Sequence, residues 1–337
     1  MRMSTKFLSW SLAACLGAAA LTVTLQKYAL AVDCQTRDGK ISSCSPKPLK
    51  WAKSAFVEFG TSPFPYDGIV PDTDKTFLDV TVGKRKGHKT ESGRVLWEDV
   101  TFRERRVLLH IPKGFDFARP GVMVVFFHGH RAILSRDVRN RQLVATQISA
   151  SGMNAVLVAP QFAIDAVDSS PGKFWVPGAF RNFVEEASNK LAGLHGNSAA
   201  AEAFSKMPVI LVAYSGGYLA TAWCLEVGGA NDRLRGVVLL DALYGRFDKF
   251  VTWITHNRSS FFVSAYTQST EKENEELKAT LTEHEIKFED ALKQNIWNHG
   301  VTFLPTDFDT KHENFVTQAW ADYPISDILR RLDEFRQ

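Results

Sequence analysis

Short, wholly apolar runs recur along this chain, and a segment with helical spacing follows almost every one of them. From about residue 95 onward, the runs predict strands over residues 106–112, 122–127, 155–160, 209–214, 236–240, 261–266 and 301–304. Runs as apolar as these are typical of parallel strands that are buried on both faces. Strands that alternate with helices predict an α/β fold with a doubly wound, mostly parallel sheet.

The intervening segments carry apolar side chains at helical spacing. They predict helices over residues 137–149, 179–194 and 218–227, from about 247, over 272–283, and from about 313. No inserted segment is long enough to form a large lid domain. Residues 161–178 are rich in aromatic side chains, and we expect them to form a small aromatic wall.

The first 31 residues have the composition of a secretion signal. Arg2 and Lys6 precede an almost wholly apolar stretch at residues 7–25, and Ala29-Leu30-Ala31 fits the A-x-A cleavage pattern. We therefore expect cleavage after Ala31, and export of the mature chain to the periplasm or the medium.

A lipid anchor is an alternative, because Leu12-Ala13-Ala14-Cys15 matches a bacterial lipobox. Sixteen mostly apolar residues follow Cys15, however, where a lipoprotein carries a polar tether. An uncleaved anchor is a second alternative, since the apolar stretch approaches the ~20 residues needed to span a bilayer. We expect the mature form to have no stable membrane span.

The net charge of +3 comes entirely from the predicted secretion signal, residues 1–31. Residues 1–31 hold three basic side chains and no acidic one, which leaves 37 basic and 37 acidic side chains in the remainder. A balanced chain of this kind has no electrostatic footprint for a nucleic acid or an anionic membrane surface, so neither is expected as a partner.

Residues 32–94 are rich in Pro, Gly, Ser, Asp and Lys, and we interpret them as a loop-rich extension of the main domain at 95–337. Cys34 and Cys44 enclose a short polar loop and can pair in an oxidising compartment. Cys224 lies in an apolar stretch and is interpreted as a buried free thiol.

Candidate chemistry centres on Ser215. The strand at 209–214 ends in Ala213-Tyr214-Ser215-Gly216-Gly217, and a helix-forming segment follows at once. A turn tight enough to lift one side chain above a sheet needs small neighbours on either side. This pattern predicts a nucleophile elbow, with the serine hydroxyl at a helix N-terminus.

Serine is a weak nucleophile at neutral pH and needs a base, which an acid in turn holds in the right tautomer. His312 follows the last predicted strand, at the sheet edge expected to carry Ser215. Asp241 directly follows the strand at 236–240, where a carboxylate must find a partner or face solvent. Alternative acids are Asp307, Asp309 and Glu271.

An oxyanion hole is the third requirement, because the developing negative oxygen needs preorganised N–H donors. The backbone amides of Gly216 and His130 are the candidates, the latter within His128-Gly129-His130-Arg131. His128 and His130 could instead bind a metal, but no third ligand has suitable spacing. We expect no metal and no cofactor.

From about residue 95 to its end, the chain resembles the α/β-hydrolase family. A His-Gly turn, His128-Gly129, follows the third strand, the elbow serine follows the fifth, and a histidine follows the eighth. Most members of that family place the acid after the seventh strand. A minority place it after the sixth, as Asp241 would be here.

The resemblance implies acyl transfer to water through a covalent seryl intermediate. Its members include esterases, lipases, peptidases, amidases, acyltransferases and non-catalytic proteins, so the fold cannot choose among them. We expect an esterase acting on a small or polymer-linked acyl substrate, with a non-catalytic binding protein and a metal-dependent hydrolase as alternatives. The aromatic candidates for the pocket walls are Tyr214, Tyr218, Tyr244, Phe162 and Trp175.

Overall fold

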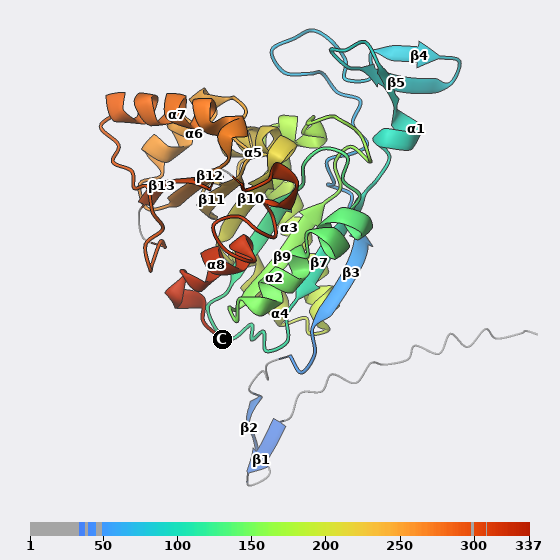
Figure 1. Cartoon of the computed structure of the whole chain (residues 1–337). Helices are drawn as coiled ribbons and strands as arrows, with labels where there is room; N and C mark the ends of the chain where they lie inside the picture. Colours follow the sequence, from blue (N-terminus) through green and yellow to red (C-terminus); the bar gives the residue numbers. More distant parts are fainter. Residues whose placement is uncertain (1–33, 38–39, 45–48, 298–299, 308) are drawn as a thin grey trace, which may run out of the picture. The chain divides into compact units, whose positions relative to one another are not determined.

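The apolar runs lie side by side in an eight-stranded sheet with the order β13-β12-β11-β10-β8-β9-β7-β3 (Figure 1). The structure, a computed structural model, describes residues 34–37, 40–44, 49–297, 300–307 and 309–337. The chain divides into Met1–Ala31 and the unit Val32–Gln337. The predicted signal peptide and Cys15 lie outside the described residues.

The strands of this sheet, in chain order, are β3 (Lys53–Glu58), β7 (Arg106–Ile111), β8 (Val122–Phe127), β9 (Ala155–Pro160), β10 (Val209–Tyr214), β11 (Leu234–Leu240), β12 (Phe261–Tyr266) and β13 (Gly300–Pro305). β7 is antiparallel to both of its neighbours, β3 and β9, and the other pairs are parallel. The prediction of a mostly parallel sheet in an α/β fold is confirmed.

The sheet has a hydrophobic core on each face. In β10, Val209, Leu211 and Ala213 belong to one core, and Ile210, Val212 and Tyr214 to the other. This alternation is what the two-residue period of a strand requires, and it explains why the central strands are apolar at every position.

Helices cover both cores. The helices are α1 (Glu98–Thr101), α2 (Val144–Ala150), α3 (Ala179–His195), α4 (Ala200–Lys206), α5 (Tyr218–Glu226), α6 (Phe247–His256), α7 (Glu271–Glu283) and α8 (Pro324–Arg330). α2 and α8 pack on one face, and α3 to α7 contribute to the core on the other.

The strand order brings three chain segments to one edge of the sheet. Phe127 at the end of β8 pairs with Ala213, and Leu240 at the end of β11 pairs with Tyr214. Because these strands are parallel, the residues that follow all three emerge together at the carboxyl edge, where ligands bind in sheets of this kind.

Residues 32–94 contain more regular structure than the loop-rich extension we expected. β1 (Cys34–Arg37) pairs with β2 (Lys40–Cys44), and β4 (Val80–Val82), β5 (Arg85–Lys89) and β6 (Val95–Trp97) form a small antiparallel sheet. β3 is the edge strand of the main sheet, so the expected boundary at residue 95 does not separate that sheet from the segment before it.

The prediction of one continuous helix over 137–149 is wrong, because the segment is divided in two. The structure has a π-helical segment, Leu134–Arg141, followed by α2, with Leu143 in the left-handed region at a φ of 53°. The carboxylate of Asp137 accepts the N–H of Ile133 at 2.8 Å and also binds Arg141, which stabilises the wide turn.

The helix predicted from about residue 313 begins later. His312–Asn314 forms a short 3₁₀ turn, and α8 starts at Pro324, which occupies the first turn of the helix. Proline suits that position because its missing N–H would have no intrahelical partner. Phe315 and Val316 are buried from irregular backbone, so their apolar character does not signal a helix.

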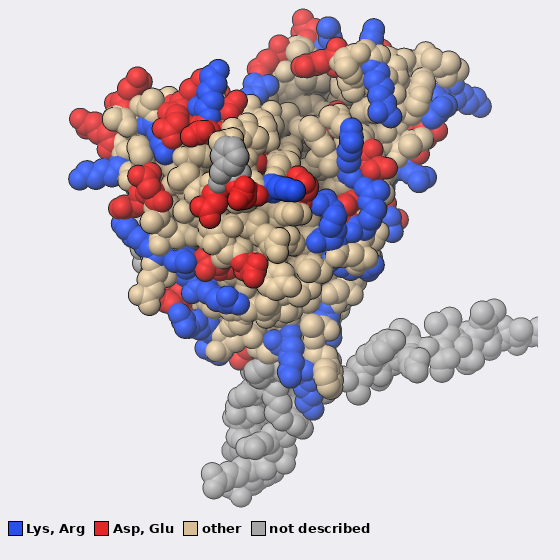
Figure 2. All heavy atoms as spheres, in the orientation of Figure 1, with Lys and Arg blue, Asp and Glu red and all other residues tan. Residues whose placement is uncertain are grey.

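Charged side chains of both signs are interspersed over the face drawn in Figure 2, and acidic ones gather over α7. Within the described residues, no helix combines the length and apolar character that crossing a bilayer requires.

We expect a disulfide between Cys34 and Cys44. The two residues are directly opposite in the antiparallel pair β1–β2, where Cα atoms are about 4.5–5.5 Å apart, within the range that a disulfide bridges. Peptide mapping of exported protein without reductant is expected to recover the two peptides linked. Cys224 is buried and serves as the internal control, alkylated only after unfolding. Recovery of two separately alkylated peptides from native protein would contradict the pairing.

Candidate active site

Ser215 stands on a sharp turn between β10 and α5. Its φ is 52°, in the left-handed region that residues other than glycine rarely adopt. A 3₁₀ turn, Ser215–Gly217, leads directly into α5. This strained strand-to-helix turn is the geometry of a nucleophile elbow.

His312 lies within hydrogen-bond distance of the serine. The distance from His312 Nε2 to Ser215 Oγ is 2.9 Å, and the distance from His312 Nδ1 to the Asp241 carboxylate is 2.6 Å. An ionised carboxylate can only accept, so Nδ1 donates to Asp241 and Nε2 is left to accept the serine proton. The structure thus brings together all three residues that the sequence singled out.

Asp241 is fully buried, and its φ of 46° turns its side chain out of the end of β11. The loop after β12 solvates the carboxylate. It accepts the backbone N–H of Thr267 at 3.1 Å, and hydroxyl protons from Thr267 at 2.8 Å, Ser269 at 2.9 Å and Thr270 at 2.6 Å.

Burial alone would raise the pKa of Asp241. The hydrogen bonds from His312, Thr270 and Thr267 outweigh it and lower the pKa to about 2. Asp241 is therefore ionised throughout the neutral range. His312 bonds this carboxylate rather than Asp307, Asp309 or Glu271, the other acids considered.

In the order of the sheet, the serine follows the fifth strand, the acid the sixth and the histidine the eighth. The chain has the α/β-hydrolase fold. The usual acid position after the seventh strand, β12, carries the hydroxyl donors to Asp241 instead.

Comparison with known proteins finds solved structures whose sequences have low identity to this chain. No family model matches the chain, and no curated sequence matches it significantly. A mutant of the feruloyl esterase module from Clostridium thermocellum, complexed with sinapinate, is 16% identical, with 81% of this chain and 96% of that one covered and a TM-score of 0.42.

An S-formylglutathione hydrolase from Agrobacterium tumefaciens is 12% identical, with 74% of this chain and 94% of that one covered and a TM-score of 0.39. A thermostable esterase from Pseudomonas putida is 13% identical, with coverages of 69% and 79% and a TM-score of 0.37. Likenesses this distant carry no conclusion about substrate or reaction, so both have to be inferred from the residues of this chain.

The His-Gly turn after β8 lies against the elbow of this hydrolase fold. A Cβ atom built on Gly129 would be 2.7 Å from the Cβ of Ser215, so any larger residue would collide with the serine. The ring of His130 lies beside Gly216. Gly129 thus lies against Ser215, and the side chain of His130 lies against Gly216. The assignment of the Gly216 and His130 amides to an oxyanion hole stays a prediction.

His128 is a structural residue of this turn. It is buried, and its Nε2 accepts the backbone N–H of Phe162 at 2.9 Å, with the amide nitrogen of Gln161 also 2.9 Å away. Its Nδ1 therefore carries the proton and donates to the carbonyl of Gly129 at 2.8 Å. Burial lowers the pKa of His128 to about 4, so the ring is neutral.

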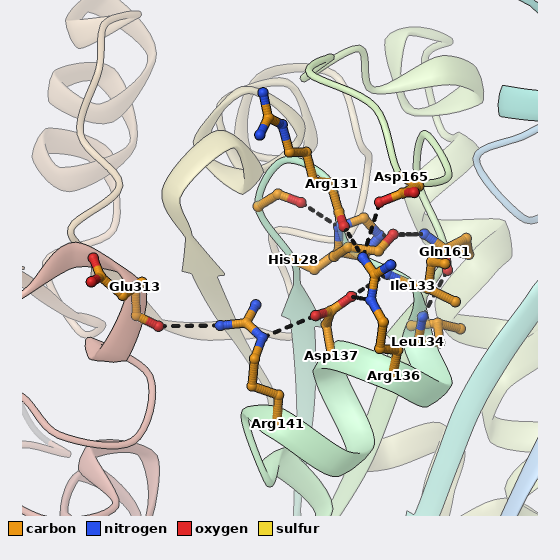
Figure 3. A network of polar contacts seen from close by, with 12 residues as sticks. His128, Arg131, Ile133, Leu134, Arg136, Asp137, Arg141, Gln161, Asp165 and Glu313 are labelled. Atoms are coloured by element: carbon orange, nitrogen blue, oxygen red, sulfur yellow. Dashed lines mark hydrogen bonds and ion pairs between the residues drawn. The ribbon is translucent and has the colours of Figure 1, made fainter.

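A polar network connects this turn to the histidine loop (Figure 3). Asp137 binds both Arg136 and Arg141, each at 2.9 Å. Arg136 donates to the carbonyl of Arg131 at 2.6 Å, and Arg141 donates to the carbonyl of Glu313 at 3.2 Å. Asp137 thus supports, through these two arginines, the backbone at Arg131 and at Glu313.

Three of the predicted pocket residues lie at the site. Tyr214 stacks on His312 with ring centroids 5.0 Å apart, and its hydroxyl donates to the His312 carbonyl at 2.9 Å. Burial raises the pKa of Tyr214 well above its ordinary value, so this hydroxyl stays protonated. Tyr244, which is 38% exposed, lies 6.5 Å from the His312 ring and 5.8 Å from the ring of Tyr218.

Trp175 and Phe162 are both buried, and their assignment to the pocket wall stays a prediction. Trp175 packs against Tyr66 and Phe77, with centroids 5.6 Å away in both cases, in a core shared with the N-terminal segment. Phe162 packs edge-on against Phe127 beneath the His-Gly turn. An aromatic residue between strands can pack in a core as well as line a pocket, and these ring contacts show the core packing.

Two sets of contributing residues were missed from the sequence. The stretch Thr267-Gln268-Ser269-Thr270 has no carboxylate, but three of its side chains donate hydrogen bonds to Asp241. That clustering of hydroxyls after a buried strand was a usable signal. Ser169, whose hydroxyl is 2.7 Å from His130 Nε2, left no signal in the sequence.

No group of three His, Cys, Asp or Glu side chains suited to a metal occurs among the described residues. A cavity of about 560 Å³ opens where β12 and β13 begin, lined by Trp253, Ile286 and Lys293 among others. It lies at the amino ends of these strands, whereas the serine, histidine and aspartate lie at the carboxyl edge.

Acidification is expected to destabilise the fold through His128. Above the ordinary pKa of 6.5 both the folded and the unfolded chain hold a neutral ring, so its contribution is complete. Between pH 6.5 and 4 the unfolded chain takes up a proton that the folded chain excludes. The pKa difference corresponds to a loss of about 3 kcal/mol by pH 4.

Urea unfolding at pH 7.5 and 4.5 measures this loss. The His128→Gln variant is expected to lose less unfolding free energy on acidification than the unsubstituted chain, and the exposed control His256→Gln to lose as much. Equal losses in all three proteins would show that His128 does not titrate in this way.

Proposed function

We propose that the protein is an exported serine hydrolase that cleaves an ester bond through a covalent acyl-serine intermediate. The observation that carries the proposal is the unbroken hydrogen-bonded series from Ser215 through His312 to the buried Asp241. A nucleophile, a base and an orienting acid in this geometry are the requirements for acyl transfer.

In the proposed reaction, Ser215 Oγ attacks the acyl carbonyl carbon while its proton passes to His312 Nε2. The carbonyl oxygen becomes an oxyanion that accepts the N–H groups of Gly216 and His130. The tetrahedral intermediate collapses, and His312 returns the proton to the departing alkoxide. Water then attacks the acyl-serine with His312 again acting as base, which releases the acid and restores the serine.

Asp241 has an electrostatic and a positional role in this cycle. Its low pKa keeps it charged while His312 becomes an imidazolium, and its hydrogen bond keeps Nε2 facing the serine. Tyr214 adds a second constraint on the same ring by stacking against it. The His312 ring is thus held in position toward Ser215 before substrate arrives.

A small-molecule or polymer-linked acyl substrate fits this proposal, and amide cleavage and acyl transfer to another acceptor use the same residues. The alternative from another class is a binding protein that has kept a hydrolase fold. The complete series of three residues favours the enzyme. A Ser215→Ala variant that preserved the biological role would favour the alternative.

Export is part of the proposal and rests on residues 1–31, with Arg2, Lys6 and the Ala29-Leu30-Ala31 pattern as support. A mature chain that begins at Val32 would retain Cys34 and Cys44 in an oxidising compartment, which connects export to the disulfide expected above.

Fluorophosphonate labelling tests the nucleophile. The mature protein is expected to be labelled at one site, and labelling is expected to disappear in Ser215→Ala and to slow by several orders of magnitude in His312→Ala. Ser92→Ala, an exposed serine in a hairpin, is the matched control and is expected to label like the unsubstituted protein. Folded protein that resists labelling would rule out an activated serine.

Asp241→Asn tests the acid. An amide cannot hold the histidine tautomer or stabilise its charge, so kcat for a p-nitrophenyl ester is expected to fall by about 10³–10⁴-fold. Asp309→Asn, at an acid of the histidine loop, is expected to leave kcat within about twofold. Loss of activity in Asp309→Asn with Asp241→Asn unaffected would reverse the assignment.

A further inference from the structure

The side chains of Ser169 and His130 meet directly above the residue that follows the nucleophile. Ser169 Oγ is 2.7 Å from His130 Nε2. A Cβ atom built on Gly216 would be 2.6 Å from Ser169 Oγ and 2.7 Å from His130 Cδ2. A larger residue at position 216 would therefore displace the Ser169 and His130 side chains from these positions.

This contact places the Ser169 hydroxyl near the proposed oxyanion position. A Cβ on Gly216 would lie about 2.5 Å from the backbone nitrogen, so Ser169 Oγ lies within about 5 Å of the Gly216 N–H donor. An oxygen atom about 3 Å from both groups fits within that span. One acyl oxygen can thus accept from Gly216 and Ser169 together.

The loop that carries Ser169 is fixed on both sides of it. The carbonyl of Ala166 accepts the N–H of Arg131 at 2.8 Å. The carboxylate of Asp168, 7% exposed, accepts the N–H of Ser170 at 2.8 Å and is 4.0 Å from His88 of β5. Ser169 is therefore held in place before substrate binds, as a preorganised donor must be.

The ring of His130 can direct the Ser169 proton. Burial lowers the pKa of His130, which favours a neutral ring with one N–H. With that proton on Nε2, the ring donates to Ser169 Oγ and leaves the hydroxyl proton free to point toward a substrate oxygen. A hydroxyl that accepts one hydrogen bond is also a better donor for the next.

We propose that Ser169 is a further oxyanion donor, and that the imidazole of His130 is its positioning residue. The inference rests on the proposed ester hydrolysis at Ser215 and adds a side-chain donor to the two backbone donors. Because the hydroxyl contacts the oxygen whose charge grows during the reaction, its contribution belongs to the transition state more than to the bound substrate.

The test compares kcat and KM for p-nitrophenyl acetate. Ser169→Ala is expected to lower kcat by about 10–100-fold and to change KM by less than about threefold. Ser169→Thr, which restores a hydroxyl, is expected to recover most of kcat. Ser170→Ala is the matched control, since its backbone N–H keeps the stronger bond to Asp168, and is expected to behave like the unsubstituted protein.

The positioning role of His130 is measured by non-additivity. His130→Phe keeps the backbone N–H and the ring volume but removes the ring nitrogen, and is expected to lower kcat by about 3–10-fold. In a Ser169→Ala background the same change is expected to cost less than about twofold, because the hydroxyl it positions is gone. Fully additive losses would overturn this role.

Fluorophosphonate stoichiometry separates failure of this inference from failure of the proposed function. Ser169→Ala is expected to label completely but more slowly, which shows an intact Ser215. If the unsubstituted protein is active and Ser169→Ala has the same kcat, or only a raised KM, the oxyanion role is overturned while ester hydrolysis stands. If the unsubstituted protein neither labels nor turns over ester, both proposals fall together.

Discussion

The arrangement of Ser215 and His312 at the carboxyl edge of the sheet depends on the buried negative charge of Asp241. Asp241 has no exposed surface, and an uncompensated carboxylate in such a place would be neutral or would unfold its surroundings. Its charge persists because five hydrogen bonds, from His312 and from the loop after β12, replace water. The loop after β12, the usual position of the acid in this fold, therefore donates hydrogen bonds to Asp241 and does not itself carry the acid.

The same edge depends on backbone strain that the sheet can support. Ser215 and Asp241 both have positive φ values, and each directly follows a strand that is buried on both faces. Strands with a core on either side cannot shift to relieve such strain, so the side chains stay aimed at His312. The packing of both cores against the sheet therefore helps to fix the geometry of the site.

Much of the fold could be predicted because buried parallel strands leave apolar runs of recognisable length. The bounds of β8, β9 and β12 match the expected ones, and the order of Ser215, Asp241 and His312 follows from the strands that precede them. β3 was missed because it is a half-exposed edge strand with Lys53 and Glu58 at its ends. An edge strand lacks the second buried face that makes the pattern visible.

Other features depend on contacts between distant segments and were not predictable. The sequence around Phe315 resembles a helix because it contains apolar residues. These side chains are buried from an irregular loop, where apolar positions need not follow a regular spacing. Trp175 packs on Tyr66, more than one hundred residues earlier, and no local pattern in the sequence predicts that contact. Ser169 is one hydroxyl in a loop, and its significance depends on the folded position of Gly216.

Asp137 has a consequence for how such a site can change. It binds Arg136, which holds the turn of Arg131, and Arg141, which holds the carbonyl next to His312. The turn at Arg131 and the loop that carries His312 are therefore both connected to Asp137. A change at Asp137 would therefore disturb the backbone at Arg131 and the backbone at Glu313 together, although the two lie far apart in the sequence.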